Sequence, residues 1–468
     1  MHGKIGAAPA VERRPARPHT MGLQGGELPC GLKGCGTMSR LLVEGPTPLA
    51  GEIRVQGAKN SALPILTSAL LCDSPSMIHN CPDLLDVEAS CGILRHLGCS
   101  VRREGQSVFI DPAGVSKYDV PDALMREMRS SIVFLGAICA KLGRARISFP
   151  GGCELGPRPI DLHLAALRQL GVRIEEDHGW LNCRVEDELR GADIMLSFPS
   201  VGATENIILA AATAHGTTTI VNAAREPEIE DLAAFLNACG GNVRGAGEST
   251  VVVEGVRALH GCEHEVIADR IAAATYMSAA AATGGSLRLT NINLRHLTPL
   301  LPVFEEAGCA LSNRAAPQGR NADVLEISRR GKLRPVRGVR TMPYPGFPTD
   351  AQAPVMAMAA LADGISIFIE NIFENRYKHA SELVRMGAKI KLEGKVAIVE
   401  GVPKLYGAQV EATDLRGGAA LVVAGMAAEG ETVVSGVHHI DRGYDGIEAA
   451  LSSLGAKIRR IGDTDAAT

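Results

Sequence analysis

A unit of about 70 residues that recurs six times constrains the fold of this chain more than any other sequence feature. Each copy has an Ala-rich helical stretch, a β-branched strand, a polar turn into a second helix, and a further strand. The second helices end at glycines, a common helix terminator, separated by 73, 69, 68, 79 and 68 residues: Gly98, Gly171, Gly240, Gly308, Gly387 and Gly455. The pattern predicts an α/β protein of six repeated units, three plus three.

Length and composition support two globular domains. The chain has 468 residues, more than one ordinary core accommodates, and 46% of them are apolar. A net charge of -4 gives no sign of nucleic-acid binding, and no stretch approaches the roughly 20 apolar residues of a membrane-spanning helix. Residues 1–37 are rich in Pro, Gly and Arg and lack the apolar core of a secretory signal, so we expect a disordered extension.

The cysteines predict no metal site. There are 12, without a CxxC pair or the companion histidine spacing of zinc sites. Most lie in apolar runs, as small core residues do in a reducing compartment, which favours the cytoplasm. The pair Cys30 and Cys35 in the N-terminal tail is weak evidence for metal binding.

The stretch from Ile147 to His163, ISFPGGCELGPRPIDLH, predicts a shaped loop between a strand and a helix. Three glycines and three prolines restrict its backbone, Cys153 lies near its tip, and Arg158 stands between two prolines. A displayed thiol near fixed positive charge can be tuned for proton transfer or nucleophilic attack. The alternative is a surface turn with an incidental cysteine.

Charged residues recur where the first helix of each unit begins. Free N–H groups at such positions attract anions, and arginine binds phosphate and carboxylate well. If two domains face each other there, the cleft would collect Lys59, Arg129, Arg158, Arg270, Arg416 and Arg442. Asp350, in GFPTDAQAP, would cap its helix or deprotonate a substrate hydroxyl. The alternative is ordinary capping and surface charge. Since no GxGxxG or GxxxxGK[ST] motif occurs, ATP hydrolysis and a dinucleotide cofactor are not indicated.

Ten short motifs follow one another between about Leu41 and Ile461: GAKNSALPIL, MRSSI, PGGCELGPRPIDLH, SVGAT, NAAREPEI, ADRI, FPTDAQA, FENRY, ATDLR and HIDRGY. In these motifs the chain resembles the enolpyruvyl transferases, and most of all the branch that acts on UDP-N-acetylglucosamine. The resemblance implies a two-domain inside-out α/β barrel with six βαβαββ-type units, three per domain around buried helices. It places one domain at 59–267 and the other at 38–58 with 268–462, leaving 463–468 as a tail.

The resemblance also implies a reaction. Members of this branch move the enolpyruvyl group of phosphoenolpyruvate to the 3-hydroxyl of UDP-N-acetylglucosamine and release phosphate, by addition and then elimination. This is the first committed step of peptidoglycan biosynthesis, and it needs neither a metal nor an organic cofactor. The partners it implies are these two substrates, without nucleic acid or membrane insertion. The sequence identifies no regulatory protein.

The resemblance assigns roles to individual residues. Cys153 would protonate the methylene carbon or assist release, and it corresponds to the thiol that fosfomycin alkylates in this family. Lys59 would contact phosphoenolpyruvate and Asp350 would act as the base. Arg442 with Arg158 would clamp phosphate and carboxylate, and Asp414 is a second acidic candidate. The implied substrate-binding set is Lys59, Asn60, Arg129, Arg158, Pro159, Ile160, Asp161, Leu162, Ser200, Val201, Gly202, Asp269, Asp350, Ile372, Phe373, Arg416 and Arg442.

Three other readings remain open: the shikimate 3-phosphate branch of the family, a non-catalytic nucleotide-sugar-binding protein, and a purely structural repeat scaffold. The PGGC loop and the HIDRGY motif favour the amino-sugar branch. The retained chemical residues disfavour a non-catalytic protein, and the charges gathered at six helix starts disfavour a structural scaffold. The chain departs from the family pattern at Asp83 and Leu85, where lysine is common, and at Gly417-Gly418. We expect both departures to lie outside the catalytic set.

Overall fold

The structure is a computed structural model that describes residues 2, 39–149, 160–316 and 321–462. Backbone contacts divide the chain into residues 1–37 and residues 38–468, and the second unit contains every helix and strand of the described residues. The predicted site residues Cys153, Arg158 and Pro159 lie outside the described residues, as do the predicted tail 463–468 and nearly all of the extension.

The described strands are β1 (Arg40–Gly45), β2 (Ala50–Arg54), β3 (Ser76–His79), β4 (Ser100–Glu104), β5 (Ser107–Asp111), β6 (Asp119–Val120), β7 (Arg144–Ser148), β8 (Val172–Asp177), β9 (Trp180–Val185), β10 (Asp193–Met195), β11 (Thr217–Val221), β12 (Asn242–Arg244), β13 (Thr250–Glu254), β14 (Glu263–Glu265), β15 (Ser286–Ile292), β16 (Cys309–Arg314), β17 (Asp323–Arg329), β18 (Val339–Arg340), β19 (Ile365–Ile369), β20 (Lys389–Glu393), β21 (Val396–Glu400), β22 (Gln409–Glu411), β23 (Gly430–Ser435) and β24 (Lys457–Ile461).

The α-helices are α1 (Lys59–Ser68), α2 (Leu85–Leu97), α3 (Asp122–Glu127), α4 (Phe134–Leu142), α5 (Asp161–Gln169), α6 (Val201–Ala211), α7 (Pro227–Ala238), α8 (Arg270–Thr283), α9 (Leu294–Leu297), α10 (Leu301–Glu306), α11 (Thr349–Ala359), α12 (His379–Arg385), α13 (Leu415–Ala427) and α14 (Ile447–Ser452). Short 3-10 turns are η1 (Ala69–Leu71), η2 (Arg129–Val133) and η3 (Val437–His439). Within these ranges, no helix is both long and apolar enough to cross a membrane.

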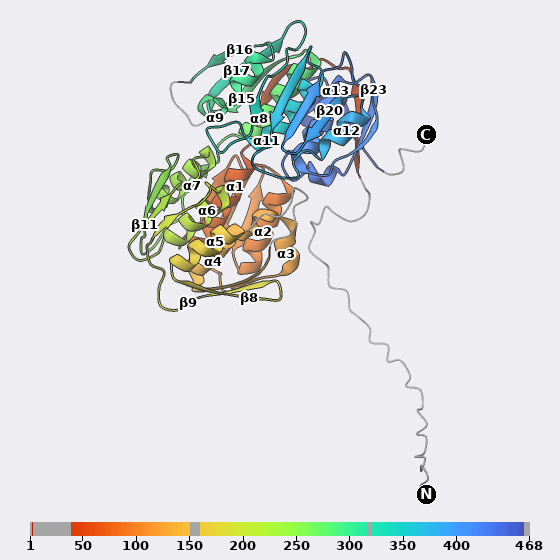
Figure 1. Cartoon of the computed structure of the whole chain (residues 1–468). Coiled ribbons are helices and arrows are strands. Elements are labelled where there is room, and N and C mark those ends of the chain that lie inside the picture. Colours follow the sequence, from red (N-terminus) through yellow and green to blue (C-terminus); the bar gives the residue numbers. More distant parts are fainter. Residues whose placement is uncertain (1, 3–38, 150–159, 317–320, 463–468) are drawn as a thin grey trace, which may run out of the picture. The chain divides into compact units, whose positions relative to one another are not determined.

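Six four-stranded sheets in the described part share one plan (Figure 1). A central strand pairs with an edge strand in parallel and with a third strand in antiparallel fashion, and this third strand pairs with a fourth. In the second unit β7 is central, β6 is the edge, and β9 and β8 form a hairpin. In the sheet of β23 the outer pair is β1 and β24, which are far apart in sequence. The six predicted helix-ending glycines all have positive φ, between 90° and 113°, a conformation that residues with a Cβ rarely adopt. The predicted α/β class and the repeat are therefore confirmed.

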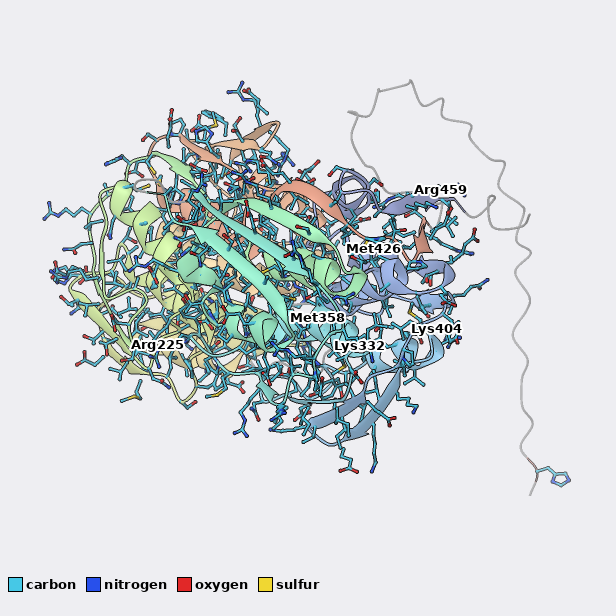
Figure 2. The ribbon with its side chains drawn as sticks, turned by 90° about the horizontal axis from the view of Figure 1, so that it is seen from above. Arg225, Lys332, Met358, Lys404, Met426 and Arg459 are labelled. Atoms are coloured by element: carbon cyan, nitrogen blue, oxygen red, sulfur yellow. The ribbon has the colours of Figure 1, made fainter. Side chains whose placement is uncertain are left out.

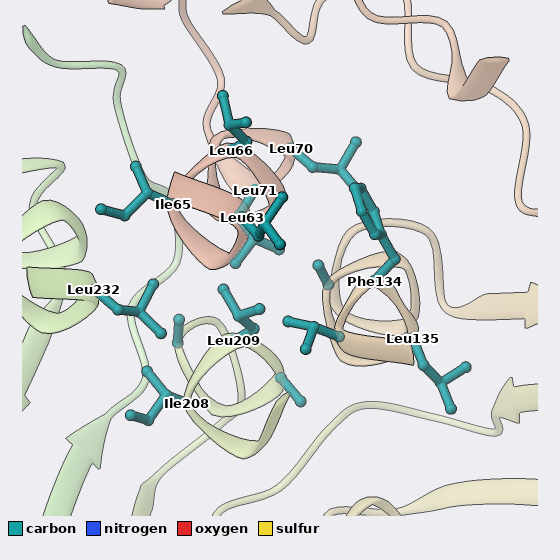
Figure 3. Close-up of a cluster of buried hydrophobic side chains, with 14 of the residues drawn as sticks. Leu63, Ile65, Leu66, Leu70, Leu71, Phe134, Leu135, Ile208, Leu209 and Leu232 are labelled. Atoms are coloured by element: carbon teal, nitrogen blue, oxygen red, sulfur yellow. The ribbon is translucent and has the colours of Figure 1, made fainter. Parts of the chain in front are cut away.

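One hydrophobic core gathers residues from Ala58 to Ile267 around α1, α4 and α6. Figure 3 shows Leu63, Leu70, Phe134, Leu209 and Leu232 in this core, contributed by α1, η1, α4, α6 and α7. These side chains are at most 5% exposed. Because burying one leucine contributes roughly 1.5–3 kcal/mol, this apolar contact dominates the stability of the three units.

A second core combines Leu41–Val55 with residues from Ile271 to Ile458, around α8, α11 and α13. Every α8 residue from Arg270 to Ala282 is buried, as expected for a helix surrounded by protein. Met358 and Met426 are buried on α11 and α13, whereas Lys332, Lys404 and Arg459 are exposed (Figure 2). Helices lie inside and sheets outside, which confirms the predicted inside-out arrangement.

The chain passes between the two cores at Gly57 and again at Ala268, and these two points form a β-bridge. Ala58 N–H donates to the Ile267 carbonyl at 2.7 Å on one side of the bridge. A Cβ at Gly57 would lie 1.7 Å from the Asn80 carbonyl oxygen, so no side chain fits there. Strand β2 consequently joins the sheet of β15, and β14 joins the sheet of β3. The exact boundaries of the two domains stay a prediction.

Candidate active site

Asp86 connects two of the cations that the sequence pointed to. Its carboxylate accepts hydrogen bonds from Lys59 Nζ at 2.8 Å and from Arg442 Nε at 2.8 Å. The Asp86 side chain is only 2% exposed, whereas those of Lys59 and Arg442 are 12% and 31% exposed. Lys59 begins α1 in the first core, and Arg442 follows η3 in the second. The charge cluster therefore joins residues that are far apart in sequence.

Local structure explains why Asp86 carries its charge. It lies in the first turn of α2, where backbone N–H groups favour a negative charge. Burial raises the pKa of Asp86, but Lys59 and Arg442 outweigh this effect and hold it below its ordinary value. Sequence reasoning missed Asp86. A signal was available in the sequence. Lys59 begins the first helix of this unit, and Asp86 stands in the first turn of its second helix.

Gln56 fixes the turn that carries Arg442. Its side-chain amide donates to the Gly443 carbonyl at 3.0 Å and accepts from the Asp445 N–H at 2.9 Å. Gln56 is 6% exposed and directly precedes the crossing at Gly57. The same buried residue thus connects the crossing with the position of the guanidinium.

Asp350 forms a second charge cluster with two buried arginines. Its carboxylate accepts from Arg376 Nη2 at 2.8 Å and from Arg416 Nη2 at 3.4 Å. Arg416 is 1% exposed, and its Nε and Nη1 have no hydrogen-bond partner among the described residues. Although burial disfavours its charge, Tyr444 and Asp350 raise the pKa of Arg416. A buried guanidinium with open donors is suited to bind an anion.

Glu370 holds the backbone around this cluster, and sequence reasoning missed it too. One carboxylate oxygen accepts from Thr341 Oγ1 and from the N–H groups of Ile372 and Phe373, at 2.8–3.1 Å. The other accepts from Thr349 Oγ1 at 3.0 Å, directly before Asp350. Since Glu370 is 1% exposed, one buried acid fixes both the predicted base and two predicted sugar-nucleotide contacts.

Asp414 is the N-cap of α13, where Oδ1 accepts from the Arg416 and Gly417 N–H groups at 3.0 Å each. Its Oδ2 and both ring nitrogens of His379 are buried without a hydrogen-bond partner among the described residues. Burial lowers the pKa of His379 to about 4, although Asp414 acts against this, so the imidazole is neutral near pH 7.

One expectation about the departures from the family pattern is wrong. A Cβ at Gly417 would lie 2.6 Å from Asp414 Oδ2, so this glycine is packed directly against a predicted catalytic residue. A Cβ at Gly418 would meet Ile440 at 2.7 Å. At the other departure, Leu85 directly precedes Asp86 and its side chain is exposed, so the expectation for that position stays a prediction.

Asp269 and Arg270 have mainly internal partners. Asp269 caps α8 through Oδ1, while Oδ2 accepts from the Lys59 N–H at 3.3 Å. Arg270 is 8% exposed and binds the Glu228 carboxylate through Nε at 3.0 Å and Nη2 at 3.3 Å. The hypothesis that Arg270 is an open anion ligand is therefore wrong, because a buried carboxylate already occupies its guanidinium.

The remaining predicted contacts gather where α5 and α6 begin. Ile160, Asp161 and Leu162 open α5, and Ser200, Val201 and Gly202 open α6 with Ser200 as its N-cap. His163 joins the two starts, because a Cβ at Gly202 would lie 3.1 Å from its ring. Arg129 begins η2, which packs on α6, and Asn60 follows Lys59 on α1. Residues 150–159, which precede α5 in the sequence, lie outside the described residues.

The geometry offers two cationic clusters, Lys59–Asp86–Arg442 around a buried carboxylate and Arg376–Asp350–Arg416 around a half-buried one. Fixed cations of this kind stabilise negative charge that develops on a phosphorylated or carboxylated substrate. Within the described ranges, no group of three or more His, Cys, Asp or Glu side chains could hold a metal ion.

Comparison with known proteins agrees with this geometry. The family model described as EPSP synthase (3-phosphoshikimate 1-carboxyvinyltransferase) matches residues 43–451. UDP-N-acetylglucosamine 1-carboxyvinyltransferase 2 of Caldanaerobacter subterraneus is 50% identical over 424 residues, which is 91% of this chain and 100% of that protein. UDP-N-acetylglucosamine 1-carboxyvinyltransferase 1 of Symbiobacterium thermophilum is 48% identical over 95% of this chain and 100% of its own length.

Among solved structures, the enolpyruvyl transferase NikO from Streptomyces tendae aligns with a TM-score of 0.81 and 26% identity, covering 91% of this chain and 100% of that one. The family model carries the name of the shikimate enzyme, whereas the two full-length relatives carry that of the amino-sugar enzyme. Identity of 48–50% over their whole length decides between the branches. The chain belongs to the UDP-N-acetylglucosamine 1-carboxyvinyltransferase family of enolpyruvyl transferases.

Proposed function

We propose that this chain transfers the enolpyruvyl group of phosphoenolpyruvate to the 3-hydroxyl of UDP-N-acetylglucosamine and releases phosphate. The observation that carries the proposal is the 50% identity with a relative of that name over the relative's whole length. The reaction is the first committed step of peptidoglycan biosynthesis. We place it in the cytoplasm, which agrees with the nine described cysteines being free thiols.

The proposed chemistry is an addition followed by an elimination. The sugar hydroxyl oxygen forms a bond to C2 of phosphoenolpyruvate, while a proton from Cys153, assisted by Lys59, reaches the methylene carbon. Asp350 accepts the hydroxyl proton. Loss of a proton from the new methyl group then expels phosphate from C2 and leaves the enol ether. No oxidant, reductant or cofactor is required for this balance.

The charge clusters support the assignment of roles. A substrate that carries a phosphate and a carboxylate needs several cations, which we assign to Lys59 and Arg442 with Arg158, and to Arg129 and Arg416 in support. Asp86 offsets only one of the two positive charges of Lys59 and Arg442, because its single carboxylate binds both side chains. Because two cations face one carboxylate, this cluster keeps excess positive charge. The phosphate and carboxylate of phosphoenolpyruvate carry more negative charge than this excess, so we infer that the other arginines also contribute.

The test is phosphate release from phosphoenolpyruvate with UDP-N-acetylglucosamine as the acceptor, beside a Cys153→Ala variant. We expect wild-type release and a large loss in the variant. Release that survives in the variant would keep the enzyme and remove Cys153 from the chemistry. Release only with shikimate 3-phosphate would assign the chain to the other branch of the family. No release with either acceptor would favour a non-catalytic nucleotide-sugar-binding protein.

A further inference from the structure

Three arginines lie in a row across one outer sheet, far along the sequence from Lys59 and Arg442. In the pairing of β7 with β9, Arg144 lies directly opposite Arg184, and in the pairing of β8 with β9, Arg173 lies opposite the same Arg184. Directly opposite residues on antiparallel strands share a face, and like charges at such positions are destabilising. We call Arg144, Arg184 and Arg173 the arginine row; β8 and β9 are labelled in Figure 1.

Internal partners compensate the row only in part. Arg173 binds Glu175 at 2.9 Å and Glu186 at 3.3 Å. The Arg184 guanidinium is exposed and has no hydrogen bond or ion pair with any residue that the structure describes. Arg144 lies over the Tyr118 ring at 3.9 Å. Stacking orients a guanidinium but adds no negative charge, so positive charge remains in excess.

A fourth arginine extends the same face. Arg146 lies two residues along β7, opposite Asn182, and its guanidinium is 4.3 Å from the centre of the Trp180 ring. Two of the four guanidiniums thus lie over aromatic rings. Their N–H edges are available for oxygen atoms of a ligand, because the ring occupies only one face of the guanidinium plane.

The four arginines border a cavity of about 450 Å³, which Glu175 and Glu186 also line. This volume falls in the range of small-molecule sites, roughly 300–1,000 Å³. The row spans two strand spacings, about 10 Å, which suits an extended ligand with several anionic groups better than a single ion. Four cations against two carboxylates select for negative charge.

We propose that this face of the β6-β7-β9-β8 sheet binds a small oligophosphate, as a site separate from the one that holds the enolpyruvyl transfer residues. The arginine row and Arg146 bind its phosphate oxygens, and Trp180 lies beneath one of the contacts. The inference does not depend on the proposed function, since it uses none of the residues assigned to that chemistry.

Trp180 makes the site directly observable, because it is the only tryptophan in the chain. Tripolyphosphate is titrated into the full-length protein at constant ionic strength, and Trp180 fluorescence and isothermal calorimetry are recorded in parallel. We expect a saturable change at submillimolar concentration in both measurements. Saturating phosphoenolpyruvate and UDP-N-acetylglucosamine should leave the affinity unchanged.

Arg184→Ala is the decisive variant, because its side chain is exposed and lacks internal partners among the described residues. We expect its affinity for tripolyphosphate to fall about tenfold or more, as for the loss of one charge-assisted contact. Arg102→Ala is the matched control. Arg102 is an exposed arginine on β4 that stacks over Phe109 at 4.7 Å in a neighbouring sheet. This control should bind like the wild type.

Several results would overturn the proposal. They are the absence of saturable binding, equal affinity in wild type and Arg184→Ala, or displacement by phosphoenolpyruvate, which would place tripolyphosphate in the transferase site. A polyglutamate peptide is titrated in the same way, to test whether the face binds acidic proteins. Saturable binding of that peptide without binding of tripolyphosphate would make the face a surface for acidic proteins instead.

Discussion

Replacing Asp86 by asparagine tests the charge cluster that joins the two cores. The substitution keeps the side-chain shape and one acceptor oxygen but removes the negative charge between Lys59 and Arg442. Both cations contact the carboxylate at 2.8 Å, and the Asp86 side chain is 2% exposed. Breaking a buried ion pair by removing one partner costs roughly 3–5 kcal/mol. Because asparagine keeps one acceptor, we expect the free energy of unfolding to fall by about 3 kcal/mol at pH 7.

The pH dependence of the unfolding free energy shows whether the charged form of Asp86 stabilises the fold. The pKa of Asp86 is lowered in the folded protein, so the folded state binds this proton less readily than the unfolded state does. The stabilisation is therefore fully present above the unfolded pKa of about 3.9 and is lost as the pH falls through the lower folded value. The difference between wild type and Asp86→Asn should be constant from about pH 6 to 8 and should narrow below about pH 4.

Urea unfolding, followed by circular dichroism and by Trp180 fluorescence, measures the difference; Trp180 begins β9, whose Leu181 belongs to the same core as α2. Asp122→Asn is the matched control, since Asp122 lies in the first turn of α3 and pairs with Arg126 at 2.6 Å on the surface. We expect no measurable change in the control. Equal stabilities of the Asp86→Asn and Asp122→Asn variants at pH 7 would refute the reasoning, and so would a difference that does not narrow in acid.

Substitutions at four further positions test other parts of the structure. Glu370→Ala removes the carboxylate that accepts hydrogen bonds from two backbone N–H groups and two hydroxyls, so the KM for UDP-N-acetylglucosamine should rise about tenfold or more with a smaller change in kcat. In the same kinetic assay, Glu370→Gln should recover most of the loss. Leu209→Ala in the first core should lower the free energy of urea unfolding by about 2–5 kcal/mol. Gly57→Ala should give little soluble protein on expression, because its Cβ would overlap the Asn80 carbonyl. Arg184→Thr should raise the unfolding temperature, since it removes one of three like charges from the arginine row. An unchanged KM, free energy of unfolding, soluble yield or unfolding temperature would contradict the respective expectation.

The repeat could be predicted from the sequence, because local residue patterns mark the helices and strands of each unit. Gly98 and its five counterparts end helices with positive φ, a conformation that sequence reasoning ties to glycine. Small side chains in α8 and α13 permit close helix packing and predicted burial on all sides. The pairing of β2 with β15 and of β14 with β3 could not be predicted from local signals, because these strands are about 200 residues apart. Only the family resemblance grouped residues 38–58 with 268–462.

The site residues show the same difference between local signals, which the sequence contains, and long-range contacts, which it does not. Lys59, Asp350 and Arg442 were predicted because they stand in motifs, whereas Asp86 stands in none and Arg376, although it belongs to FENRY, was given no role. A partner is brought close by the fold and not by the sequence: Asp86 and Arg442 are 356 positions apart in the chain, yet their side chains are hydrogen-bonded at 2.8 Å. Arg270 shows the opposite failure: its motif suggested an anion ligand, but Glu228 occupies it from a different helix.

Because of these pairings, an arginine in a motif of this protein is not necessarily available to bind an anion. A guanidinium that already has a buried carboxylate adds little net charge to a substrate site, as Arg270 shows beside Glu228. Arg416 differs, because Asp350 contacts only its Nη2 and leaves Nε and Nη1 without a partner among the described residues. Donors that are buried and unpaired are costly to maintain unless a ligand satisfies them. The anion-binding capacity of the site therefore depends on which nitrogens the carboxylates leave open, and counting cations in the sequence does not measure it.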